Sequence, residues 1–310
     1  MKKLRAQKTL VSIMIFLALA STPYLFKSAN AQPALSTIFI QPDGSVYPTS
    51  APIQRSGNIY TFTDNVYAAV KILKGNVVLD GAGYTLKGPF NGNSTDIWVI
   101  GTGPDPNTLD KYTIGVDLGN KSVNGITIEN LDVENFSIGM YIWTQNNTVT
   151  GNTVSHNIVG LLISGSNATI SRNYISDNLR GVFMGFNTGV TPNDILVFQN
   201  DFEKNQIQLS GCQCKTYNMS EPPHNWDNGK QGNYWSDYNG TDSNHTGIGD
   251  TPYIIDVLDR DRFPLMQNPI KPSVPASTIP IETIVLGISA SAVLVVMVFT
   301  VKRMRKRKTS

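Results

Sequence analysis

The sequence predicts an all-β protein built as a parallel β-helix, a stack of coils closed by a cap at each end. A motif of Gly followed by apolar residues recurs every 21 residues, at Gly139, Gly160 and Gly181. Other positions keep the same step: Val149 and Ile170, Val154 and Ile175, Asn152 and Asn173, Asn157 and Asn178. Short β-rich runs fill each period, Asn and Gly separate them, and no stretch keeps helical spacing. Self-similarity at a fixed period marks a stacked repeat architecture.

Each period has room for three brief strands and three bends, which make one coil. Successive coils stack at the usual strand spacing of about 4.8 Å. We therefore expect columns of Ile and Val in the interior and hydrogen-bonded Asn ladders at the bends. The recurrent Gly suits bends that need a positive φ. The alternative is an antiparallel β-sandwich with coincidental spacing, which the shared step of several independent positions disfavours.

Composition and pattern divide the chain into seven segments. They are a signal peptide (1–31), an N-terminal cap (32–75), the β-helix (76–210), a C-terminal cap (211–268), a Pro/Ser/Thr linker (269–280), a transmembrane helix (281–301) and a basic tail (302–310). The Gly-, Pro- and Asn-rich stretch Pro89–Lys111 is predicted to leave the solenoid as a long loop. Long loops on rigid scaffolds often carry function.

The two ends predict a single-pass cell-membrane protein with its body outside. Basic residues, the apolar run Leu10–Ala20 and an Ala29–Ala31 cleavage site form the pattern of a secretory signal. A retained N-terminal anchor is the alternative. Residues 284–301 are uncharged and apolar, and six basic residues follow from Lys302 onward. That order predicts a membrane span with a cytoplasmic tail, with a cleaved sorting signal as the alternative.

The charge balance argues against nucleic acid as a partner. Eleven of the 25 basic residues lie in 1–31 and 302–310, so the body between them is acidic. An exported body also makes Asn-x-Ser/Thr sequons relevant as glycosylation acceptors. They begin at Asn93, Asn120, Asn135, Asn146, Asn167, Asn218, Asn239 and Asn244.

The C-terminal cap contains aromatic residues that suit two roles. Trp226, Tyr234 and Trp235 fit a cap that closes the end of the solenoid. Exposed Trp and Tyr side chains also stack on sugar rings, so these three are candidate ligand-binding residues.

Several motifs resemble the NosD-type β-helix family. The motifs are the opening Val77–Tyr84 and the closing Gly232–Tyr238, Gly247–Asp256 and Asp261–Leu265, and the resemblance covers roughly 59–268. It implies a right-handed parallel β-helix outside the cytoplasm. The family is often described as periplasmic and copper-binding, and its best-known members mature the copper site of nitrous-oxide reductase with a transporter and a lipoprotein. Its repeat unit is also described in carbohydrate-binding proteins and sugar hydrolases.

This chain departs from that family pattern by its predicted C-terminal anchor and its many sequons. Similar anchored chains look archaeal. The maturation role is therefore not carried over.

One loop has the spacing of a calcium turn. Oxygen donors stand at positions 1, 3, 5 and 9, with a backbone carbonyl at position 7: Asp242, Asn244, Thr246, Asp250 and Ile248. Calcium prefers hard oxygen ligands from alternate residues. Position 12 is Tyr253 rather than Glu, which predicts weak affinity. A plain Gly/Asp turn is the alternative.

A second cluster offers the softer ligands that suit copper. Cys212, Cys214, Met219 and His224 lie within 13 positions, and thiolates with a thioether suit Cu(I). A disulfide between the two cysteines, or two free thiols, is the alternative.

Two pairs of acids are weak candidates for glycoside hydrolysis, which needs two carboxyls across one bond. Asp132 and Glu134 flank an inward Val, and Asp201 and Glu203 flank an inward Phe. The first pair is followed one coil later by Thr153 and Ser155, so no acidic column forms.

These observations predict a membrane-anchored extracytoplasmic binding or surface protein that recognises a polysaccharide or a cell-envelope partner. A carbohydrate-active lyase or hydrolase is one alternative. A NosD-like copper-handling factor is the other.

Overall fold

The computed structural model describes residues 36–90, 112–120, 122–185, 192–211, 224–256 and 258–270. All of these lie in one compact unit, and all of its regular elements in these ranges are strands. The predicted signal peptide, transmembrane helix and tail lie outside the described residues, as do the linker after Ile270 and most of Pro89–Lys111.

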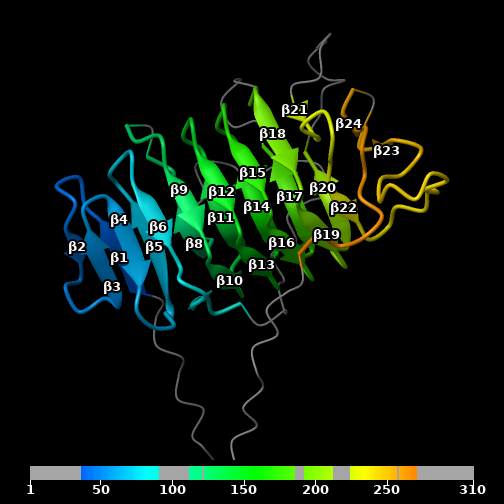
Figure 1. Cartoon of the computed structure of the whole chain (residues 1–310). Coiled ribbons are helices and arrows are strands. Elements are labelled where there is room, and N and C mark those ends of the chain that lie inside the picture. Colours follow the sequence, from blue (N-terminus) through cyan, green and yellow to red (C-terminus); the bar gives the residue numbers. More distant parts are fainter. Residues whose placement is uncertain are drawn as a thin grey trace, which may run out of the picture. The chain divides into compact units, whose positions relative to one another are not determined.

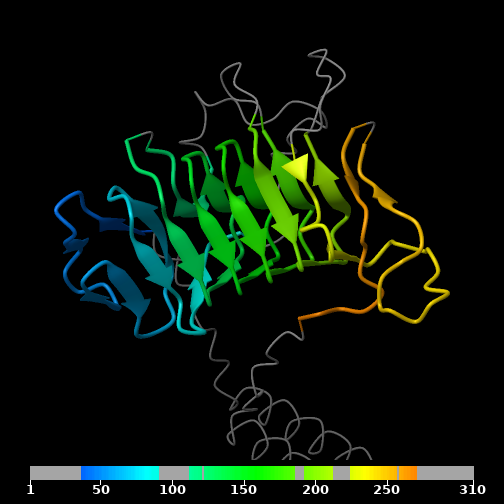
Figure 2. The same ribbon diagram turned by 45° about the horizontal axis from the view of Figure 1, so that its top comes forward.

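Three sheets of mainly parallel strands form the body (Figures 1 and 2). Sheet A contains, in spatial order, β2 (Val46–Tyr47), β1 (Ser36–Ile40), β5 (Ala68–Ile72), β8 (Ile114–Asp117), β11 (Ile138–Ile142), β14 (Val159–Ile163), β17 (Arg180–Met184) and β20 (Ile207–Ser210). Sheet B contains β21 (His224–Asn225), β18 (Ile195–Phe198), β15 (Thr169–Ser171), β12 (Thr148–Thr150), β9 (Thr127–Glu129), β6 (Val78–Asp80), β4 (Ile59–Phe62) and β3 (Ile53–Ser56). Sheet C contains β22 (Tyr234–Trp235), β19 (Asp201–Glu203), β16 (Tyr174–Ser176), β13 (Thr153–Ser155), β10 (Asp132–Glu134) and β7 (Thr85–Lys87).

The strand register confirms the parallel β-helix. Val149 is paired with Ile170 and Val154 with Ile175, one coil apart, as the 21-residue step predicts. Residues of this kind fill one continuous interior, since Val133, Val149, Ile170 and others are fully buried. Figure 1 shows the coils following one another along a single axis in sequence order.

The repeated glycines lie in one row, but inside strands rather than at bends. A Cβ on Gly139 would lie 2.6 Å from the carbonyl oxygen of Gly160, and a Cβ on Gly160 would lie 2.6 Å from that of Gly181. None of the three has a positive φ. The predicted bend role is therefore wrong, and the missing side chain instead leaves room for the backbone of the next coil.

The left-handed bend conformation belongs mostly to other residues. Non-glycine residues with a positive φ include Asn130, Asn135, Asn146, His156, Asn167, Arg172 and Asp177. Asn and Asp tolerate this region better than most side chains because they bond locally to the backbone. His156 is exposed at such a bend.

Two ladders of buried Asn side chains confirm the prediction of hydrogen-bonded Asn ladders at the bends. In the longer ladder, Asn152, Asn173, Asn200 and Asn233 follow one another. Each of the first three donates its backbone and side-chain N–H groups to Oδ1 of the next, at 2.9–3.1 Å. The second ladder joins Asn157, Asn178 and Asn205. The amides thus satisfy backbone groups that the bends leave unpaired.

Parallel stacking begins earlier than the repeat in the sequence. β1, β5 and β4 all pair in parallel with strands of the stack, although they lie in the segment predicted as a cap. Among the described strands of this N-terminal segment, only β2 and β3, at the outer edges, run antiparallel to their partners. Partner strands here are separated by unequal lengths of chain, so no fixed period marks them.

The C-terminal end is closed by aromatic packing. Phe202, Trp235 and Tyr253 form a continuous stack, with ring centroids 4.4 and 4.3 Å apart. Tyr253 belongs to the antiparallel pair β23 (Tyr253–Ile254) and β24 (Arg260–Asp261), which follows the last parallel strands. The stack continues the apolar interior of the coils to the end of the solenoid.

Candidate ligand pocket on sheet A

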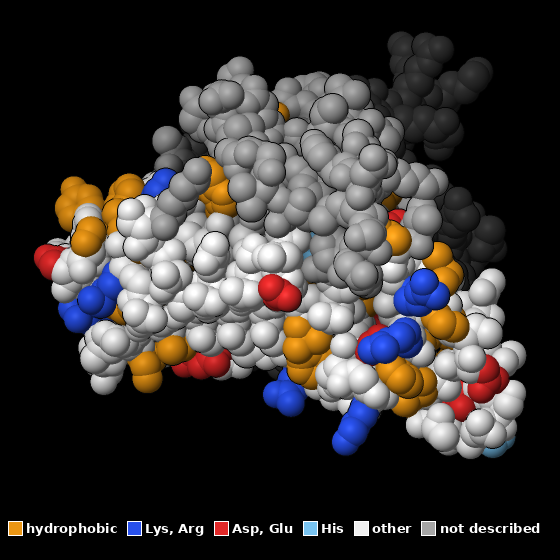
Figure 3. Space-filling model, turned by 90° about the horizontal axis from the view of Figure 1, so that it is seen from above, with side chains coloured by type: hydrophobic (Ala, Val, Ile, Leu, Met, Phe, Trp, Pro, Cys, Tyr) orange, Lys and Arg blue, Asp and Glu red, His pale blue; other side chains and the backbone are white. Residues whose placement is uncertain are grey.

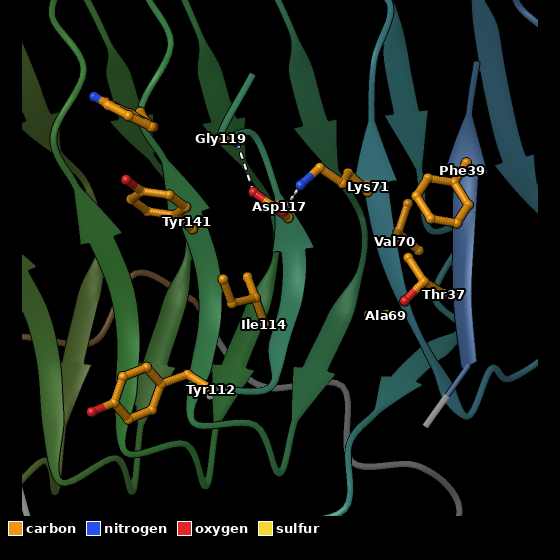
Figure 4. Close-up of a pocket in the computed structure, with 11 residues that line it drawn as sticks. Thr37, Phe39, Ala69, Val70, Lys71, Tyr112, Ile114, Asp117, Gly119 and Tyr141 are labelled. Carbon is orange, nitrogen blue, oxygen red and sulfur yellow. Dashed lines mark hydrogen bonds and ion pairs between the residues drawn. The ribbon is translucent and has the colours of Figure 1, made fainter. Parts of the chain in front are cut away.

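A pocket of about 450 Å³ lies on the outer face of sheet A, over β1, β5, β8 and β11. It is lined by Thr37, Phe39, Ala69, Val70, Lys71, Tyr112, Ile114, Asp117, Gly119, Tyr141 and Trp143 (Figure 4). Its volume falls in the range of small-molecule sites in proteins. Side chains alternate between the two faces of a strand, so Lys71, Asp117 and Tyr141 project away from the buried Val70, Val116 and Met140.

One ion pair stands in the pocket. Lys71 Nζ lies 2.8 Å from Asp117 Oδ2, and the backbone N–H of Gly119 donates to Asp117 Oδ1 at 2.7 Å. Figure 4 shows the lysine reaching along the sheet toward the carboxylate. The register puts both residues opposite each other on β5 and β8.

Aromatic side chains supply most of the apolar lining. Tyr141 and Trp143 are stacked with centroids 5.9 Å apart, and Phe39 and Tyr112 line the same pocket. Aromatic faces beside a few placed polar groups are typical of a site for an amphipathic ligand. A sugar fits this description, because its ring presents C–H faces and its hydroxyls both donate and accept hydrogen bonds.

Along sheet A, the pocket gives way to an apolar face that is buried. Tyr141, Leu162 and Phe183 occupy one row across β11, β14 and β17, and each is at most 3% exposed. They belong to a cluster separate from the solenoid interior. The pocket therefore lies where this apolar row meets the charged pair.

This pocket is not predicted by the sequence. Phe39, Lys71, Asp117 and Tyr141 form a row only through the strand register. Unequal stretches of chain separate them, one of which contains Pro89–Lys111. The signal available was the alternation along each strand, which predicts outward positions but not which of them meet.

In the predicted calcium loop, hydrogen-bond donors of the loop itself bind the carboxylates of Asp242 and Asp250. Asp242 accepts the N–H groups of Thr246 and Gly247, and Asp250 accepts donors from Thr241 and Ser243. These interactions are those of the alternative, a hydrogen-bonded turn. Asn244 is exposed, Ile248 is half-buried, and calcium binding stays a prediction.

The predicted copper set is described only at His224. This ring is fully buried, and its Nδ1 lies 2.8 Å from Asp259 Oδ2. A carboxylate on one ring nitrogen is common behind metal-bound histidines. Cys212, Cys214 and Met219 lie outside the described residues. Within the described ranges, no three His, Cys, Asp or Glu side chains gather in a way that suits a metal ion.

The acid pairs lie where the pattern predicts, on the outer face of sheet C. Thr153 and Ser155 are paired with Asp132 and Glu134, so the acidic column is absent there as expected. Asp201 is not solvated, because it is 0% exposed and accepts the backbone N–H of Ile270 at 3.0 Å.

The surroundings of Asp201 and Glu203 shift their pKa values in opposite directions. Burial raises the pKa of Asp201 to about 8, whereas the hydrogen bond from Lys204 lowers that of Glu203. Divergent pKa values are typical of a catalytic acid and base. The complete burial of Asp201 nevertheless keeps a substrate from this carboxyl in this structure.

The two tryptophans of the C-terminal cap pack in the interior. Trp226 and Trp235 are each 1% exposed, and Trp235 Nε1 donates to Asp261 at 2.9 Å. Neither indole presents a face to a sugar, because both are enclosed. Tyr234 is half-buried and pairs with β19 at Asp201.

Several predicted glycosylation acceptors are accessible. Asn146, Asn167, Asn239 and Asn244 are exposed, and Asn120 and Asn135 are half-buried. Asn93 and Asn218 lie outside the described residues.

The face in Figure 3 carries mainly uncharged groups over the described part. Basic side chains on it are scattered rather than gathered into one patch.

The described ranges contain no helix that could cross a membrane. The predicted span at 281–301 lies outside those ranges.

Comparison with known proteins identifies a family. The family model described as "Periplasmic copper-binding protein (NosD)" matches residues 57–240, more than half of the chain. No curated protein and no solved structure matches. The matched segment contains the parallel strands from β4 to β22. The chain therefore belongs to the NosD family, which is described as periplasmic and copper-binding.

Proposed function

We propose that this protein is a membrane-anchored extracytoplasmic β-helix that binds a polysaccharide in the pocket on sheet A. The observation that carries this proposal is the combination of Phe39, Tyr112 and Trp143 with the Lys71–Asp117 pair in one pocket. The family description as periplasmic supports a body outside the cytoplasm.

Binding is better supported than hydrolysis. Among the described residues that line the pocket, Asp117 is the one carboxylate, and it is paired with Lys71. A glycosidase needs two carboxyls across the scissile bond. A lyase or hydrolase therefore remains the lesser alternative.

The rest of the proposal concerns chain topology. The signal at 1–31 would export the body, and the apolar segment 281–301 would hold it at the membrane with the basic tail inside. A right-handed coil follows from the strong preference of parallel crossovers for that hand.

Glycan binding by the wild-type protein and two variants tests the proposal. Trp143→Ala removes an aromatic face of the pocket, and we expect affinity to fall about tenfold, because such a contact contributes roughly 1 kcal/mol or more. Tyr234→Ala is the matched control in the cap, and its affinity should stay unchanged. Loss with Tyr234→Ala but not Trp143→Ala would move the site to the cap.

A second candidate function is copper handling. The family description and the His224–Asp259 pair favour it. If Cys212, Cys214, Met219 and His224 hold copper, their thiolate and thioether sulfurs would favour the reduced ion. Copper titration of the Cys212→Ser/Cys214→Ser variant decides this, because equal binding with and without the thiols removes the candidate.

A further inference from the structure

The charged side chains in the pocket on sheet A form an ion pair, so their charges cancel. Of its described lining residues, only Lys71 and Asp117 are charged, and they are 2.8 Å apart. Their side chains are 39% and 17% exposed, so both remain within reach of a ligand. A ligand in this pocket thus meets a donor and an acceptor but no net charge.

We propose that this pair makes the pocket select uncharged glycans over uronate-containing ones, with Asp117 as the residue that sets the selectivity. The inference rests on the proposed function. Hydroxyls of a neutral sugar can accept from Lys71 and donate to Asp117 while the pair stays intact. A uronate carboxylate would have to displace Asp117 from the lysine and would then lie beside a like charge.

Asp117 is held in place more firmly than Lys71. Its Oδ1 accepts the Gly119 N–H at 2.7 Å, and β8 lies between β5 and β11 in the sheet. The carboxylate therefore cannot easily rotate away from an approaching anion. Because it is largely buried, solvent and salt screen the repulsion less than on an open surface.

Asp117→Asn tests the selectivity. Asparagine has nearly the same shape and its Oδ1 can still accept from Gly119, but it leaves the lysine without a counter-charge. Full-length wild-type and variant proteins in detergent are compared on an array that pairs neutral oligosaccharides with their uronate analogues. We expect Asp117→Asn to gain about tenfold or more in affinity for the uronates, with neutral binding changed only a few-fold.

The matched control is Asp80→Asn on sheet B. Asp80 makes the same kind of turn, since its Oδ1 accepts the Ala82 N–H at 2.9 Å, and it lies outside the pocket. This variant changes net charge equally and should leave both affinities unchanged. Lys71→Gln is a second pocket variant, and it should still reject uronates because Asp117 retains its charge.

The outcomes separate the two claims. Equal wild-type affinity for neutral and uronate glycans, or no uronate gain in folded Asp117→Asn, overturns the selectivity while leaving glycan binding intact. A gain that Asp80→Asn reproduces also overturns it, since net charge would then be the cause. Absence of any glycan binding by wild type overturns the proposed function itself.

Discussion

Asp261 shows how a single residue completes the longer Asn ladder. Each Asn in the ladder accepts hydrogen bonds from the Asn before it and donates to the next one. Asn233 is the last, so its own N–H groups need another acceptor. Asp261 Oδ2 accepts the Asn233 N–H at 2.6 Å and Trp235 Nε1 at 2.9 Å, and Oδ1 accepts the Phe263 N–H. Burial raises the pKa of Asp261 to about 6, so the carboxyl is ionised at pH 7 and both oxygens accept.

We predict that Asp261→Asn lowers the free energy of unfolding by about 1–3 kcal/mol at pH 7. The amide nitrogen would replace one accepting oxygen, so its N–H₂ group would face a buried N–H donor that then has no acceptor. Urea denaturation measures this. Asp177→Asn is the control, since Asp177 is an exposed bend residue with φ 54°, where Asn is tolerated. Equal stability of wild type and Asp261→Asn would contradict this role.

At the scale of strands, the row of Gly139, Gly160 and Gly181 determines how closely neighbouring strands of sheet A approach one another. We predict that Gly160→Ala costs about 1–3 kcal/mol, because its new Cβ would lie 2.6 Å from the carbonyl oxygen of Gly181. A drop of several degrees in melting temperature is the expected readout. Thr169→Ala, on the half-buried side of β15, is the comparison and should melt close to wild type.

The segment ending at Ile270 is bound to sheet C through a titrating carboxyl. Burial raises the pKa of Asp201 to about 8, the Ile270 N–H lowers it, and Glu203 raises it. The folded protein therefore holds this proton more tightly than the unfolded chain, whose Asp pKa is near 3.8. The contribution to stability is complete below pH 4 and is lost as pH rises to about 8.

Asp201→Asn should remove this part of the pH dependence, because the amide keeps an acceptor for Ile270 but does not titrate. Urea denaturation across pH 4–9 measures the effect. Parallel pH profiles of wild type and variant would show that Asp201 titrates normally.

The sequence predicted the repeating elements well and the site poorly, for physical reasons. Val149, Ile170 and the Asn ladders stack at a fixed step, so a period in the sequence reports them directly. The glycines at 139, 160 and 181 were found but misassigned, because a period does not distinguish a bend from a close approach in a strand. Lys71 and Asp117 meet through strand pairing across unequal loops, which no local pattern encodes.

For the whole molecule, the predicted topology has a direct consequence. Truncation after Ile270 removes the predicted linker from residue 271 onward, the span and the tail, while keeping every described residue. We expect the full chain in the membrane fraction and the truncated chain released in soluble, folded form. Membrane association that survives truncation would place the anchor elsewhere, with the retained N-terminal segment as the first candidate.

The function proposed for this protein requires that the ligand binds to the outer face of sheet A. The most direct measurement is a crystal structure of the protein with a neutral oligosaccharide that it binds. We predict sugar rings against Trp143 and Tyr112, with hydroxyls bonded to Lys71 and Asp117. Sugar bound instead to the C-terminal cap or to sheet C, with the sheet A pocket unchanged, would contradict the account.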